Sequence, residues 1–157
     1  MNRKKQIKAI NEFLAVLYDQ ETRFSMILEK GGFNTEQIES LRTLHLEQII
    51  AAFLSTLKQI LVGPSSSERL YEIISSRFGL EGQAEETLHT IGNRLGITRE
   101  RVRQLEKKAL RKCRNKINMR KLETSLYNTA SQALRIEGQQ TQIDLADSNQ
   151  TSHEKKK

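Results

Sequence analysis

Residues 87–111, TLHTIGNRLGITRERVRQLEKKALR, decide the fold of this chain. Thr87 and Thr98 each precede a run with helical spacing, and threonine is a residue type that caps helix N-termini. Gly96 separates the two runs, at a place where glycine adopts a left-handed turn at little cost. The pattern predicts helices over 87–94 and 98–114.

The second of these helices has two different sides. Val102, Leu105 and Ala109 lie within about 60° of one another on a wheel of about 100° per residue, so we expect this side to be buried against the first helix. The opposite side carries Glu100, Arg103, Gln104, Lys107 and Arg111, and Arg99 projects from the N-terminal end. This arrangement predicts a helix-turn-helix, whose second helix enters the major groove of DNA.

The residue types on the exposed side suit DNA. Arginine donates two hydrogen bonds to guanine, glutamate accepts one from cytosine, and glutamine pairs with adenine. We therefore expect base contacts from Arg99, Glu100 and Gln104. Other cations of this helix are expected to contact phosphates and set the register, namely Arg101, Arg103, Lys107 and Lys108. The alternative interpretation is a basic helix surface that is merely solvated.

Positive charge is concentrated around this helix. The chain has 157 residues and a net charge of +7. Residues 1–64 have a net charge of +1, residues 65–135 of +7 and residues 136–157 of −1, and within 99–121 eleven basic residues face two acidic ones. A basic stripe on a helix is typical of a polyanion binder, which favours nucleic acid as the partner.

The rest of the chain is predicted to be helical as well. Apolar spacing predicts a helix over 5–29 and a second over about 35–62, capped by Asn34 or Thr35, which together form an antiparallel hairpin. Further helices are expected over 68–77 and 117–134. We therefore predict an all-α fold with three parts: a hairpin over 1–64 for partner or dimer contacts, a DNA-binding domain over 65–135, and a disordered tail over 136–157.

Several classes of protein are disfavoured. His45, His89 and His153 are far apart in sequence, and Cys113 is expected to be a small core residue. No metal-ligand spacing and no phosphate-binding glycine loop is present, so we predict no catalysis, no metal and no cofactor. With no apolar stretch of membrane-spanning length and one cysteine, the expected location is the cytoplasm.

Residues from about 69 to 114 resemble region 4 of the sigma-70-type factors of bacterial RNA polymerase, especially the primary sigma factors. The residues that carry the resemblance are RFGL at 77–80, TL at 87–88, IG at 91–92, LG at 95–96, ITRERVRQLE at 97–106 and ALRK at 109–112. The resemblance covers less than a third of the chain, and the run at 97–106 is its most specific part.

The resemblance implies roles for individual residues. In that family the second helix contacts the promoter −35 element, which implies base contacts for Arg99, Glu100 and Gln104. Contacts with the DNA backbone, or a role in positioning it, are implied for Arg69, Arg77, Thr87, Leu88, Arg101 and Arg103. The basic stretch with Lys108 and Arg111 is implied to meet activators or other partners. The family's region 4 also binds the flap-tip helix of the polymerase beta subunit on its apolar side.

Two features depart from the family. His89 and Thr90 stand where acidic residues are usual, so the first helix lacks the glutamate of a capping box. Residues 1–64 match neither region 2 nor region 3, and the chain has no tryptophan, so we do not expect it to open a promoter alone.

The leading expectation is a stand-alone region 4-like transcription factor that binds −35-like DNA together with RNA polymerase in the bacterial nucleoid. One alternative is a regulator that binds polymerase or sigma by protein contact. Another is the region 4 half of a split sigma factor, with region 2 on a separate chain. A homodimer is not favoured, because a region 4 of this type usually acts as one copy.

Overall fold

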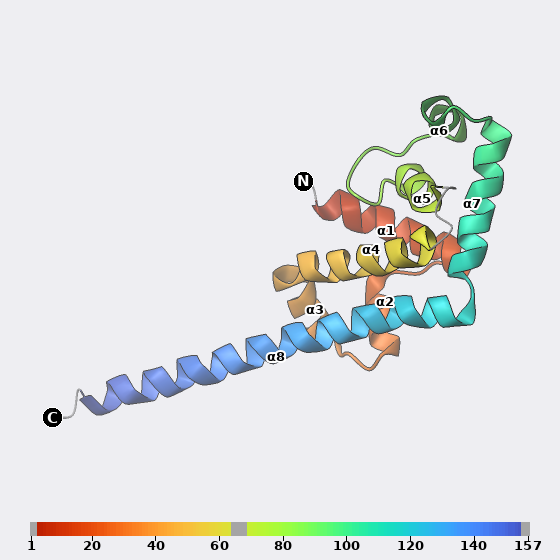
Figure 1. The fold of residues 1–157 in the computed structure, drawn as a ribbon. Coiled ribbons are helices and arrows are strands. Elements are labelled where there is room, and N and C mark those ends of the chain that lie inside the picture. The colour runs from red at the N-terminus through yellow and green to blue at the C-terminus, as the bar shows by residue number, and fades with distance from the viewer. Residues whose placement is uncertain (1–2, 64–68, 155–157) are drawn as a thin grey trace.

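The computed structural model describes residues 3–63 and 69–154, with side chains described up to residue 135. Within these ranges the chain forms helices and no strand, which confirms the predicted all-α class (Figure 1). The helices are α1 (Arg3–Tyr18), α2 (Phe24–Lys30), α3 (Thr35–Leu44), α4 (Leu46–Val62), α5 (Leu70–Phe78), α6 (Leu88–Leu95), α7 (Arg99–Cys113) and α8 (Lys116–Glu154).

The single helix predicted over 5–29 is wrong, because the chain turns between α1 and α2. Asp19 has a φ of 55°, a left-handed conformation that a helix cannot contain. The side chain of Asn11 then accepts a hydrogen bond from the backbone N–H of Phe24 at 3.1 Å, which satisfies one of the unpaired donors at the start of α2. The apolar stripe continues across the break because Phe24 and Leu28 still face the core.

The helix predicted over 35–62 is also divided. Asn34 caps its start as expected, and a reciprocal pair of hydrogen bonds with Gln37 completes a capping box. His45 then leaves helical geometry, with φ −126° and ψ 18°, so that α3 ends and α4 begins around one residue. The N-terminal part is therefore a group of four helices rather than a two-helix hairpin.

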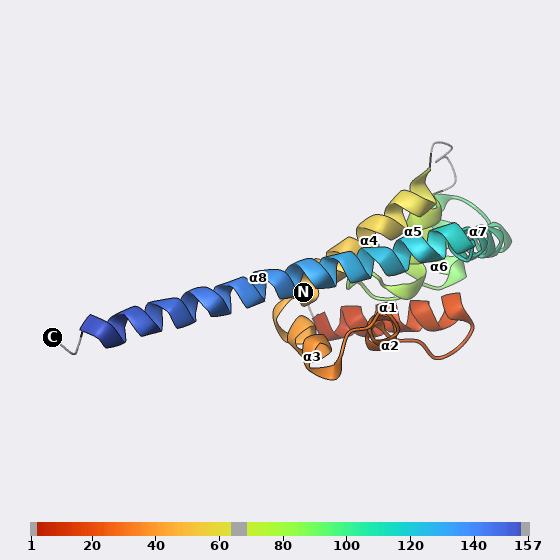
Figure 2. The same ribbon diagram turned by 90° about the horizontal axis from the view of Figure 1, so that it is seen from below.

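The helices predicted over 68–77, 87–94 and 98–114 are confirmed as α5, α6 and α7. Each end lies within two residues of the predicted one. The last helix, predicted over 117–134, begins at Lys116 and extends to Glu154 as α8, which projects beyond the other helices (Figure 2). The prediction of a disordered tail over 136–157 falls on residues whose side chains lie outside the described part. Among the described residues, no helix combines the length and apolarity needed to cross a membrane.

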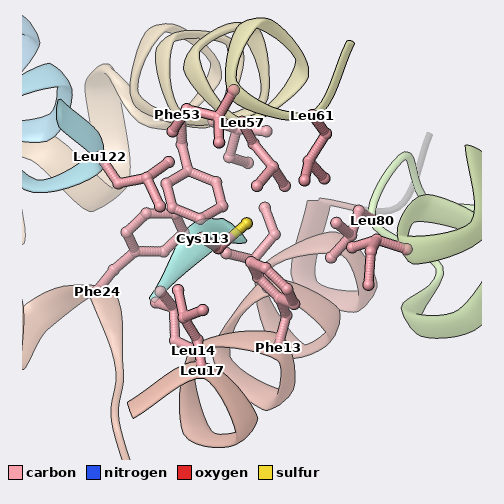
Figure 3. Packing of buried hydrophobic residues seen from close by; sticks show 14 of the residues in the cluster. Phe13, Leu14, Leu17, Phe24, Phe53, Leu57, Leu61, Leu80, Cys113 and Leu122 are labelled. Atoms are coloured by element: carbon pink, nitrogen blue, oxygen red, sulfur yellow. The ribbon is translucent and has the colours of Figure 1, made fainter. Parts of the chain in front are cut away.

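One hydrophobic core connects the N-terminal helices with α5 to α8. The ring of Phe13 in α1 contacts Phe53 of α4 and Phe78 of α5 edge to face, at centroid distances of 6.3 and 5.3 Å. Cys113 is fully buried in the same core, as expected, and lies among the side chains of Phe13 and Phe53 (Figure 3). Burial raises the pKa of the Cys113 thiol to about 12, so this thiol is unreactive at neutral pH.

Polar contacts reinforce the same connection. The buried side chain of Gln6 donates a hydrogen bond to the carbonyl oxygen of Leu80 at 3.0 Å. Arg114, at the end of α7, donates to the carbonyl oxygens of Val16 and Leu17 at 2.7 and 3.1 Å. These carbonyls belong to the last turn of α1, where no intrahelical partner is available. The C-terminal end of α7 is therefore fixed to the C-terminal end of α1.

We predict that Phe13→Ala lowers the free energy of unfolding by about 3–5 kcal/mol, because it removes a fully buried ring that contacts both α4 and α5. Urea denaturation followed by circular dichroism measures this, and hydrogen exchange should show faster opening of α6 and α7 as well as α1. Val16→Ala is the matched control, since Val16 lies on the same helix with 40% of its surface exposed. Unchanged protection of α6 and α7 in Phe13→Ala would contradict a shared core.

Candidate DNA-binding site

Helices α6 and α7 form the predicted helix-turn-helix; α6 lies on the side of the molecule opposite α2 and α3, and α7 runs from there along one edge to the start of α8 (Figure 1). The hydroxyl of Thr87 accepts a hydrogen bond from the N–H of Thr90, and that of Thr98 accepts one from the N–H of Arg101, both at 3.1 Å. Gly96 has a φ of 72°, the left-handed conformation expected at the turn. Both predicted caps and the glycine turn are confirmed.

Gly92 permits a close approach that sequence reasoning did not identify. The N–H of Ile97 donates to the carbonyl of Gly92 at 3.0 Å, so the turn folds back onto α6. A Cβ atom at position 92 would lie 2.7 Å from the carbonyl oxygen of Ile97, which is backbone and cannot rotate away. The angle between α6 and α7 therefore depends on glycine at this position.

The two sides of α7 differ as predicted. Val102 and Ala109 are fully buried and Leu105 is 4% exposed. On the other side the three residues predicted to contact bases, Arg99, Glu100 and Gln104, are all exposed. They are the first, second and sixth residues of α7, so they project within about two turns of its N-terminal end.

Glu100 is held by Arg103 in the free protein. The guanidinium of Arg103 donates to both carboxylate oxygens, with Nε–Oε2 at 2.8 Å and Nη2–Oε1 at 2.5 Å. These hydrogen bonds from Arg103, together with its charge, lower the pKa of the Glu100 carboxyl. Gln104 in turn accepts a 3.4 Å hydrogen bond from Arg101. The exposed face thus carries an ordered set of donors and acceptors rather than independent side chains.

The predicted backbone-contacting residues have different surroundings. Arg77 is partly buried, where its Nε donates to Glu106 of α7 and its Nη1 to the carbonyl of Glu86, both at 3.2 Å. It therefore ties α5 to α7, which leaves less of its guanidinium available for a phosphate. The Leu88 side chain is 9% exposed, so any phosphate contact there would use its main chain. Arg69 is exposed and has a φ of 53°.

Three further cations of α7 are open to solvent. Lys107 lies one turn after Arg103, on the side that carries the residues predicted to contact bases, and Arg111 follows one turn later; both are exposed. Lys108 is also exposed, and it lines a cleft of about 390 Å³ beside α7 rather than the side with the predicted base contacts. The activator or partner role predicted for Lys108 and Arg111 stays a prediction.

Arg94 was not predicted from the sequence as a site residue, although its guanidinium makes several polar contacts. From the last turn of α6 its guanidinium contacts Glu72 at 2.8 Å, Glu86 at 3.1 Å and the Ser76 hydroxyl at 2.9 Å. These contacts tie α6 to α5, and a network of this kind orders an interface better than an isolated surface pair. Its only signal in the sequence is a basic residue in the last turn of a helix.

Comparisons with known proteins agree with this geometry. Residues 67–115 match the family model described as sigma-70, region 4, so this segment is a helix-turn-helix of the sigma-70 region 4 type. The match spans less than half of the chain. No solved structure matches the chain.

Similar curated proteins are also sigma factors. The chain is 33% identical over 95 residues to the RNA polymerase sigma-B factor of Nostoc sp., covering 59% of this chain and 25% of that protein. It is 42% identical over 60 residues to the sigma factor SigA of Bacillus sp., covering 38% of this chain and 16% of that protein. It is 34% identical over 97 residues to SigA1 of Synechococcus elongatus, covering 62% and 22%. The chain thus spans a quarter or less of the length of these relatives.

We predict that Gly92→Ala destabilises the protein by about 1–3 kcal/mol, because the added methyl group forces α6 away from the turn. Thermal or urea unfolding measures the change, and the backbone resonances of Ile97 and Thr98 should shift. Asn93→Ala, at the exposed neighbouring position, is the control and should change stability by less than about 0.5 kcal/mol. A Gly92→Ala protein as stable as this control would show that the close approach is not required.

We predict that Arg103→Ala raises the pKa of Glu100, because the largest cause of its depression is the hydrogen bond from Arg103. The Glu100 carboxylate stays charged above its lowered pKa. The wild-type ion pair should therefore persist above this pKa and be lost only as the pH falls through it. Titration of the Glu100 side chain by NMR measures this. Lys107→Ala is the control with a smaller effect, and a Glu100 pKa that does not respond to Arg103→Ala would exclude the pair in solution.

Proposed function

We propose that this chain binds promoter DNA containing a −35-like element, with the N-terminal end of α7 in the major groove, and that it acts with RNA polymerase at transcription initiation. The observation that carries the proposal is the joint exposure of Arg99, Glu100 and Gln104 on a helix whose opposite side is buried. This helix lies within the segment that matches sigma-70, region 4. Such a function operates where the DNA is, in the bacterial nucleoid.

The chemistry of the three side chains supports base contacts. Arg99 is a bidentate donor for guanine, and Glu100 accepts from the cytosine amino group. Because Arg103 orients the Glu100 carboxylate before binding, less side-chain entropy is lost when it reaches a base. Arg101 on the flank of α7, and Arg103 and Lys107 beside the three side chains, are the cations that we propose contact phosphates, which suits a role in setting register.

RNA polymerase is the proposed protein partner, since the similar proteins named above are RNA polymerase sigma factors. The structure limits how a beta flap helix could bind. The apolar side of α5 is covered by this chain's own α1, through the ring contact of Phe13 with Phe78 and the hydrogen bond from Gln6 to Leu80. A flap helix on that side must displace α1, or bind to what α1 and α4 leave exposed.

A second candidate function is regulation by protein contact alone, with polymerase or a sigma factor as the partner. The observation that favours it is a groove of about 790 Å³ between α1, α2, α3 and α4, with a mainly apolar lining that includes Ile7, Phe24 and Leu28. A partner bound there would leave α7 unused. Removal of the α7 side chains distinguishes the two functions, because it should weaken promoter binding only if the first one is correct.

We predict that Arg99→Ala and Glu100→Ala each weaken binding to a promoter duplex by about 1–3 kcal/mol, or about 5- to 150-fold, and relax the preference for one base pair. Fluorescence anisotropy with matched and single-substituted duplexes measures both effects. Lys30→Ala, at the exposed end of α2, is the control and should bind like wild type.

Equal binding of wild type, Arg99→Ala and Glu100→Ala, with no preference among duplexes, would reject the base-contacting role. If these variants also retained RNA polymerase in a pull-down, the protein-contact function would be favoured instead.

A further inference from the structure

A basic cleft lies beside α7, between the C-terminal end of α4, the start of α5 and the C-terminal half of α7. Its volume is about 390 Å³. Four cations line it, namely Lys58 of α4, Arg69 before α5, and Lys108 and Lys112 of α7, together with one carboxylate, Glu72. Lys58 lies outside the segment that matches sigma-70, region 4.

The charge in this cleft is not balanced within the described residues. Glu72 contacts Arg94 at 2.8 Å and Arg69 at 3.8 Å, so its charge is shared with cations that surround it. The ammonium of Lys58 lies over the ring of Tyr71, 5.8 Å from its centroid, a contact that leaves its positive charge uncompensated. Among the described residues, no carboxylate is within ion-pair distance of Lys58 or Lys112. The cleft therefore favours an anion.

The cleft continues a stripe of cations along α7. Arg101, Lys108 and Lys112 lie within about 40° of one another on the helical wheel and span about 16 Å of its length. This stripe is the flank of α7 next to Gln104, between the base-contacting side and the buried side. In helix-turn-helix complexes the phosphates that border the major groove lie along such flanks.

We propose that the basic cleft binds the phosphodiester backbone of the DNA duplex, and that Lys58 extends the DNA contact from the helix-turn-helix to α4. The inference rests on the proposed function. It assigns to the N-terminal helices a direct part in DNA binding, in addition to supporting α5 and α7. The phosphates nearest the C-terminal half of α7 are held by Lys58 and Lys112, while the bases are contacted from its other end.

The salt dependence of DNA binding tests this proposal, because each phosphate contact contributes about 0.9 to the slope of log K against log salt. Lys58→Ala and Lys112→Ala should each reduce the magnitude of the slope by about 1, with the preference among promoter duplexes unchanged. Lys58→Arg keeps the charge and should restore the wild-type slope. Lys30→Ala removes a lysine far from the cleft and should leave the slope as in wild type, which controls for net charge.

The outcomes separate the cleft from the base-contacting site. If wild type discriminates among duplexes and Arg99→Ala does not, but both cleft variants keep the wild-type slope, the cleft proposal is overturned and the proposed function stands. If wild type shows no preference among duplexes, the proposed function fails, whatever the slopes.

The cleft could instead bind the phosphate group of a small phosphorylated molecule, and inorganic phosphate is the probe for that alternative. Its titration into the full chain, followed by the amide resonances of Lys58 and Lys112, shows whether the cleft takes a small anion. Resonance shifts with free phosphate combined with unchanged DNA slopes would assign the cleft to a small phosphorylated molecule and overturn the DNA contact. Reduced slopes in both variants, restored by Lys58→Arg, support it.

Discussion

The edge-to-face contacts of Phe13 with Phe53 and Phe78 are the packing on which the rest of the structure depends. Phe78 ends α5, α5 is tied to α7 through Arg77 and Glu106, and α7 carries the residues that we propose contact bases. The ring of Phe13 therefore connects the N-terminal helices to the helix that is proposed to enter DNA. Arg114 closes the same connection from the other end of α7, through the last carbonyls of α1.

This packing has consequences for function. The N-terminal helices cover the apolar side of the region 4-type unit, so this side is buried by the chain itself. Helix α7 is held at its C-terminal end and in its middle, while the outer side of its first two turns remains exposed. A rigid support of this kind positions recognition side chains more accurately than a mobile loop does. The same packing brings Lys58 next to α7 and creates the basic cleft.

The helix-turn-helix could be predicted from the sequence because its signals are local. Thr87, Gly96 and Thr98 act on atoms within three to five residues, and the buried stripe of α7 follows from helical spacing. The breaks at Asp19 and His45 could not be predicted. The apolar stripe runs through both breaks, and the capping hydrogen bond that the N–H of Phe24 donates to Asn11 joins residues of different helices.

The site was predictable to a similar extent. Exposure of Arg99, Glu100 and Gln104 followed from the helical wheel. The bidentate pair of Arg103 with Glu100, three residues apart on one helix, was in reach but was not predicted. Arg94, Arg114 and the cleft at Lys58 depend on partners from other helices, which only the folded chain brings together. These are contacts that no periodicity in the sequence encodes.

Mapping of a promoter duplex onto the isotope-labelled chain by NMR tests the central claim most directly. We expect the largest amide shifts over the first two turns of α7, around Arg99 to Gln104, with further shifts at Lys58 and Lys112 and none in α2 or α3. Shifts confined to the groove between α1 and α4, or no shifts at a concentration where the duplex is bound, would contradict it.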